Sequence, residues 1–265
     1  MQCKTKRSET MSIKRVLIPD TTFDGDAIRT AFQCLLGVMA EDPSIKRCLL
    51  YIPTKGNIQS TTLEQALGAK TLKLLSDGNE LRIGEGAVRL ETIRTFKPYS
   101  PGDAVVVVYA DQKMMDAVDS NRSLKAVICV PHLPDAVDSW KRTWNPISPG
   151  GKQEEARLIS NPIVEAALAS LTGRINLSHR ALHSSDTGAV KDAFRILRAH
   201  RQTEDPANIR AWCIKHGWHA GAADEAMKYA AKAFSLRSKP SVQGAHWASD
   251  IYEQWQKKAA ARTTT

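Results

Sequence analysis

AVVVVY, residues 104–109, is the strongest β-strand signal in this chain of 265 residues. A continuous run of β-branched residues is typical of a strand in a parallel sheet that is covered by helices on both faces. We therefore expect this segment to lie centrally in such a sheet.

Strand and helix patterns alternate on both sides of this segment. Runs that predict strands or hairpins occur at residues 14–19, 47–52, 80–93 and 124–130, and patterns that predict helices at residues 26–39, 61–75 and 112–119. Alternating β and α units predict a mostly parallel, doubly wound sheet of the flavodoxin-like or Rossmann-like kind. The first part of the chain is therefore expected to be an α/β domain.

The chain changes character between Pro131 and Gly151, a stretch with four prolines and two glycines. We place the domain boundary near Gly151. The segments with a helical pattern beyond it are residues 162–174, 187–201, 206–216, 222–236 and 246–258, with Asn161, Asp186 and Asp205 as expected helix starts. The expected organisation is a flexible extension (1–11), the α/β domain (12–150), a basic all-helical domain (151–258) and a disordered tail (259–265).

Charge is concentrated in the second half of the chain. Residues 151–265 carry 17 Lys and Arg against 11 Asp and Glu, whereas residues 1–150 carry 20 against 17. A basic domain suggests a polyanionic partner such as nucleic acid.

The sequence contains no apolar segment long enough to span a membrane and no secretory signal, so we expect a cytoplasmic protein without membrane attachment. Its five cysteines are odd in number and widely spaced, which favours free thiols.

Acidic residues follow two of the predicted strands. Asp20, Asp24 and Asp26 follow the first strand, and Asp111 follows the central one. Ligands bind at the carboxyl ends of parallel strands, and carboxylates gathered there could hold Mg²⁺ and activate water at a phosphate ester. The alternative is structural: Asp26 caps the helix, Asp24 and Gly25 form the turn, and Asp20 and Asp111 are solvated.

A metal site in the second half is not favoured. Cys213, His216 and His219 have ligand-type spacing, but a structural zinc site needs four ligands, and these three cross a helix end at Gly217. The sequence also lacks a glycine-rich phosphate loop of the dinucleotide or Walker type. We therefore predict no cofactor, except Mg²⁺ if the acidic residues form a catalytic site.

Two short helices joined by a Gly-containing turn are expected over residues 205–236. Ile209-Arg210-Ala211-Trp212, followed by Lys215-His216-Gly217 and an aromatic residue, resembles the small DNA-binding domain of the actinobacterial xenogeneic-silencing nucleoid protein. The resemblance implies a fold like the peripheral subunit-binding domain. That family reads the minor groove with an Arg-Gly-Arg element, where this sequence has His219-Ala220-Gly221-Ala222-Ala223. DNA binding would then depend on cationic side chains that contact phosphates and do not recognise the base sequence. The candidates are Arg195, Arg198, Arg201, Arg210 and Lys215.

Three functions remain open from the sequence. The first is a bacterial or phage nucleic-acid-associated protein, more a binder of DNA than an enzyme, whose helical domain contacts phosphates and which could self-associate as a homo-oligomer. The second is a Mg²⁺-dependent phosphoester hydrolase or nuclease that uses Asp20, Asp24, Asp26 and Asp111. The third is a structural or protein-interaction module without catalysis.

Overall fold

The computed structural model describes residues 13–21, 23–56, 61–152, 157–242 and 246–263. The chain forms two compact units. Unit 1 comprises the chain up to Asp138 together with Pro146–Glu154, and unit 2 comprises Ser139–Asn145 and Glu155–Thr265. The predicted N-terminal extension, residues 1–11, lies outside the described residues.

Unit 1 contains a six-stranded sheet in the order β1-β6-β5-β2-β4-β3. The strands are β1 (Lys14–Leu17), β2 (Arg47–Ile52), β3 (Leu81–Ile83), β4 (Gly86–Thr92), β5 (Ala104–Ala110) and β6 (Ala126–Pro131). All neighbours pair in parallel except β3 and β4, which form an antiparallel hairpin. The mostly parallel sheet is confirmed, and β5 lies inside it between β6 and β2. In this order β1 occupies one edge of the sheet.

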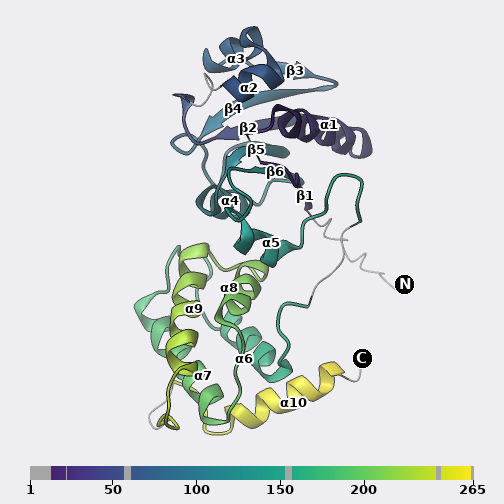
Figure 1. Ribbon diagram of the computed structural model, residues 1–265. Coiled ribbons are helices and arrows are strands. Elements are labelled where there is room, and N and C mark those ends of the chain that lie inside the picture. The colour runs from purple at the N-terminus through teal and green to yellow at the C-terminus, as the bar shows by residue number, and fades with distance from the viewer. Residues whose placement is uncertain (1–12, 22, 57–60, 153–156, 243–245, 264–265) are drawn as a thin grey trace, which may run out of the picture. The chain divides into compact units, whose positions relative to one another are not determined.

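Helices cover both faces of the sheet, as the β-branched run predicts. One face, with Val106 and Ile128, shares a core with α1 (Gly25–Glu41), α2 (Thr61–Leu67) and α3 (Ala69–Ser76). Every residue of β5 is buried, and α4 (Gln112–Asp119) packs against this strand with Met114 and Met115 buried. Figure 1 shows α4 on the side of the sheet away from α1. This burial on both faces explains why the strand is apolar at every position.

The single helix expected over residues 61–75 is divided into α2 and α3. Gly68 lies between them with φ +83°, a left-handed conformation that favours glycine. The hairpin signal of residues 80–93 is confirmed by β3 and β4, which pair as Ile83 with Gly86 and Leu81 with Val88.

Unit 2 is entirely helical over its described residues. Its helices are α5 (Asp138–Trp144, of which Asp138 belongs to unit 1), α6 (Pro162–Thr172), α7 (Ser184–Ala199), α8 (Pro206–Lys215), α9 (Ala220–Phe234) and α10 (Ile251–Thr263). Helices α6 to α10 enclose one apolar core around Phe194, Trp212 and Trp255. The expected α/β domain followed by a helical domain is therefore confirmed (Figure 1).

Three details of unit 2 differ from expectation. Helix α5 was not predicted, and most of it belongs to unit 2, so the two units interleave instead of meeting once near Gly151. Helix α10 continues past residue 258 to Thr263, into the predicted disordered tail. Asn161 and Asp205 cap their helices as expected, but α7 is capped by His183, and Asp186 instead accepts a hydrogen bond from the backbone N–H of Asn176. Within the described ranges, every helix is too short or too polar to cross a membrane.

Candidate nucleic-acid interface

Helices α7 and α9 pack side by side in unit 2. The buried face of α9 is made almost wholly of alanine, at positions 222, 223, 226, 230 and 233. Small side chains on a contact face let two helix axes approach closely. Longer side chains at the margins of this contact then line the groove between the helices.

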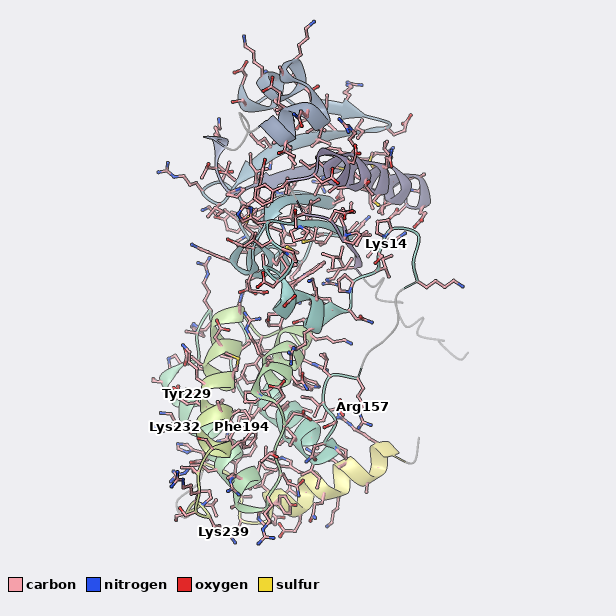
Figure 2. The ribbon with its side chains drawn as sticks, viewed as in Figure 1. Lys14, Arg157, Phe194, Tyr229, Lys232 and Lys239 are labelled. Atoms are coloured by element: carbon pink, nitrogen blue, oxygen red, sulfur yellow. The ribbon has the colours of Figure 1, made fainter. Side chains whose placement is uncertain are left out.

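A hollow of about 330 Å³ lies along this groove. Its lining combines cationic, aromatic and apolar side chains: Lys191, Arg195, Tyr229, Lys232, Ala233 and Leu236. The two α7 residues are four apart, and the α9 residues fall at intervals of three and four, so each set occupies one helix face. Figure 2 shows Tyr229 and Lys232 on the same side of the helical unit. The volume is near the lower end of the range for ligand pockets, roughly 300–1,000 Å³.

The charge lining the hollow is entirely positive. Arg195 has one carboxylate partner, Asp192, at 3.9 Å, which is longer than a hydrogen bond. The same carboxylate accepts hydrogen bonds from the backbone N–H of His246 at 2.9 Å and is 2.6 Å from its Nδ1. In the part of the chain that the structure describes, neither Lys191 nor Lys232 forms an ion pair. The hollow therefore attracts anions.

Lys191 also contacts the aromatic residue of the hollow. Its Nζ lies 4.8 Å from the centroid of the Tyr229 ring. A cation–π contact at an exposed site stabilises by only about 0.5–1 kcal/mol. An entering ligand that offers Lys191 a phosphate can displace it from the ring at small cost.

Two contacts join α7 to the end of α9 and to the residues just after it. The rings of Phe194 and Phe234 meet edge to face with centroids 5.8 Å apart. Arg198 donates a hydrogen bond from Nη2 to the carbonyl oxygen of Leu236 at 2.6 Å. Arg237 and Lys239 lie one and three residues after Leu236 and are exposed, so positive charge continues along the chain after the hollow.

The structure separates the five cations that the sequence singled out. Arg195 lines the hollow, Arg198 donates to the carbonyl oxygen of Leu236, and Arg201 is exposed just after α7. Arg210 is buried instead: its Nε donates to Asp224 at 2.6 Å and its Nη1 to the Ser139 hydroxyl at 2.7 Å. Arg210 therefore holds α8, α9 and α5 together. Lys215 is partly exposed in the last turn of α8 and does not line the hollow.

Sequence reasoning missed Lys191, Tyr229 and Lys232. Lys191 stands four residues before Arg195, so the spacing that drew attention to the arginines includes it. Tyr229 and Lys232 lie on a helix more than thirty residues further along the chain. Only the packing of α9 on α7 brings them to the same groove.

The structure does not gather the acidic residues at the strand ends into one group. Asp24 caps α1 by accepting from the backbone N–H of Asp26, Asp26 pairs with Arg29, and Asp111 caps α4 by accepting from the N–H of Met114. The expected cap on the first helix was Asp26, and the structure assigns it to Asp24. The described residues contain no group of three or more His, Cys, Asp or Glu that could hold a metal ion.

The strand order explains why these carboxylates stay apart. Asp20 follows β1 and Asp111 follows β5, and β6 lies between the two strands. With neighbouring strands about 4.8 Å apart, β1 and β5 are separated by roughly 10 Å. The structure therefore favours the structural interpretation of Asp24, Asp26 and Asp111.

The Cys213, His216 and His219 spacing has a structural explanation as well. Cys213 is fully buried, and burial raises the pKa of its thiol, which opposes the thiolate that a metal would need. The His216 ring stacks on Trp212 at 3.6 Å, and burial lowers the pKa of His216 despite its hydrogen bond with the carbonyl of Trp212. His219 is the cap residue before α9.

In the comparison with known proteins, one family model matches part of unit 2. Residues 160–256 match the model of a family described as "Domain of unknown function (DUF1889)". The match covers α6 to α9 and part of α10, and it includes every residue that lines the hollow. No curated protein and no solved structure matched the chain.

Proposed function

We propose that unit 2 binds nucleic acid through its phosphates, with the groove between α7 and α9 as the centre of the interface. The proposal depends chiefly on one observation: three cations, Lys191, Arg195 and Lys232, line one hollow that has no acidic residue in its lining. Each phosphate that a Lys or Arg neutralises releases counterions from the nucleic acid, which favours binding at low salt.

The cationic surface extends beyond the hollow, which favours a polymer over a small anion. Seven cationic residues belong to α7, to α9 and to the segment just after α9: Lys191, Arg195, Arg198, Lys228, Lys232, Arg237 and Lys239. A small anion would need only the lining of the hollow, whereas a polynucleotide passing over it would meet the flanking cations in turn. Arg201 lies beyond the end of α7 as a further candidate contact.

The likeness of residues 205–236 to a nucleoid DNA-binding domain supports DNA as the polymer. Helices α8 and α9 with the turn at Gly217 have the expected two-helix form. In our proposal the contact lies in the groove between α7 and α9 and not at the turn between α8 and α9. Positions 219–223, where that family carries its reading element, hold no cation here, and Ala222 and Ala223 are buried.

The test is the salt dependence of binding to fluorescently labelled DNA, followed by fluorescence anisotropy. We expect the dissociation constant to rise steeply with salt for the full chain. Replacing Lys191, Arg195 and Lys232 together by Gln should reduce the slope of log K against log salt by roughly 2–3, because each phosphate contact contributes about 0.7–0.9.

A matched control removes the same charge from unit 1. Lys70, Lys73 and Lys113 are exposed, and their replacement by Gln changes the net charge equally. We expect this variant to bind DNA with the slope of the unaltered protein. Equal losses in both variants would show a general charge effect, and no binding at low salt would reject the proposal.

A further inference from the structure

We infer that the hollow between α7 and α9 takes one unpaired base, so that unit 2 prefers single-stranded to double-stranded nucleic acid. The inference rests on the proposed function and adds the form of the polymer. It is based on the lining of one hollow of about 330 Å³, which combines an aromatic ring, two apolar side chains and three cations.

The lining of the hollow matches the chemistry of a nucleotide within a strand. Tyr229 offers a flat ring, Ala233 and Leu236 offer apolar contact, and the three cations stand where a phosphate could follow the base. Proteins that bind single strands combine stacking platforms with a positively charged groove in this way. A surface that served phosphates alone would need neither the hollow nor the ring.

A duplex cannot use the hollow in the same way. Its bases are paired and stacked inside the helix, so it presents phosphates and groove edges to a protein surface. Duplex DNA would therefore contact only the three cations, Lys191, Arg195 and Lys232, through its phosphates. A single strand can turn a base outward and gain the stacking contact as well.

The contact between Lys191 and Tyr229 suggests how the hollow opens. The Lys191 amine lies 4.8 Å from the centroid of the Tyr229 ring. A base that stacks on the ring takes the place of the amine, and the phosphate attached to that base gives the amine a new partner. The Lys191 amine and the Tyr229 ring thus lose their weak contact with each other, and each gains a contact with the same nucleotide.

The experiment compares a 15-nucleotide single strand of dT with a 15-base-pair duplex, using the full chain at one low salt concentration. We expect the single strand to bind more tightly. Tyr229→Ala should weaken single-strand binding roughly 5- to 100-fold, the range that stacking on one aromatic residue supplies, and should leave duplex binding unchanged. Tyr229→Phe keeps the ring and should keep the preference.

Two controls separate stacking from folding and from general aromatic contact. Tyr99 is 82% exposed in unit 1, and Tyr99→Ala should change neither affinity. If Tyr229→Ala lowers the melting temperature of the protein, Tyr229→Leu is tested in its place. Leucine fills the space of the tyrosine but has no ring for a base to stack on, so this variant should also lose the preference for single strands.

The outcomes distinguish this inference from the proposed function. Equal binding of both forms, or a Tyr229→Ala variant that binds like the unaltered protein, would overturn the unpaired-base inference while the salt-dependent binding stands. No binding of either form would overturn both. Competition by dAMP as strong as that by the strand would identify a free-nucleotide site and would also overturn the inference.

Discussion

At the scale of single residues, two helix ends in unit 2 use the same backbone motif with different side chains. After α8, the N–H groups of Gly217 and Trp218 bond to the carbonyls of Ile214 and Cys213, and Gly217 has φ +92°. After α7, Arg201 and Gln202 repeat this pattern, with Arg201 at φ +60°. This helix ending favours glycine at the left-handed position, so Arg201 is strained where Gly217 is not.

We therefore predict that Arg201→Gly stabilises the protein. Relief of the left-handed conformation is worth about 1–2 kcal/mol, and the extra freedom of glycine in the unfolded chain costs about 0.4–1 kcal/mol. The expected net gain in the free energy of unfolding is about 0.5–1 kcal/mol, measured by urea denaturation. Gly217→Ala is the control and should lose about 1 kcal/mol; a loss of stability in Arg201→Gly would contradict the explanation.

At the scale of helices and strands, much of the fold could be predicted because the spacing of apolar residues along the sequence indicates which side chains are buried. The unbroken apolar run of β5 indicated a strand covered on both faces, and Asn161 and Asp205 marked helix starts. Periodicity does not say which helices pack together. Of the residues that line the groove, the sequence therefore identified only Arg195, from the pattern of its own helix. Tyr229 and Lys232 could be found only from the packing of α7 on α9. The partner of Arg210 could not be predicted for the same reason.

The pair formed by Arg210 and Asp224 joins α8 to α9, and we predict that it acts in stability and not in binding. The Arg210 side chain is only 8% exposed, so Asp224→Ala would remove a 2.6 Å charged hydrogen bond from a buried guanidinium. Because Asp224 is 40% exposed, we expect a loss of about 2 kcal/mol, below the 3–5 kcal/mol typical of fully buried pairs.

The double variant Arg210→Met with Asp224→Ala tests this explanation. It removes the buried charge as well, so it should be more stable than Asp224→Ala alone in urea denaturation. Its affinity for DNA should match that of the unaltered protein. Glu85→Ala, which breaks the exposed pair with Lys46, should change stability by less than about 0.5 kcal/mol. A double variant as unstable as the single one would show that the buried charge is not the cause.

At the scale of the whole molecule, the interleaving of the two units determines where the helical unit can be cut. Unit 2 takes Ser139–Asn145 from the segment that the sequence analysis placed in the α/β domain. Arg142 Nη1 in this segment donates to Asp205 at 2.7 Å and to Asn208 at 3.0 Å, and the Ser139 hydroxyl accepts from Arg210. The family match begins at residue 160 and therefore does not include α5.

We predict that a fragment of residues 136–265 is more stable than one of residues 151–265. The shorter fragment lacks α5, which leaves the Nη1 of Arg210 and the carboxylate of Asp205 without the partners described above. Losing these charged hydrogen bonds should cost about 2 kcal/mol, or a melting temperature lower by roughly 8 °C in thermal circular dichroism. A fragment of residues 146–265 adds length without α5 and should melt with the shorter fragment. If all three fragments melted together, α5 would be dispensable, and the boundary near Gly151 that the prolines and glycines indicate would suffice to define the helical unit.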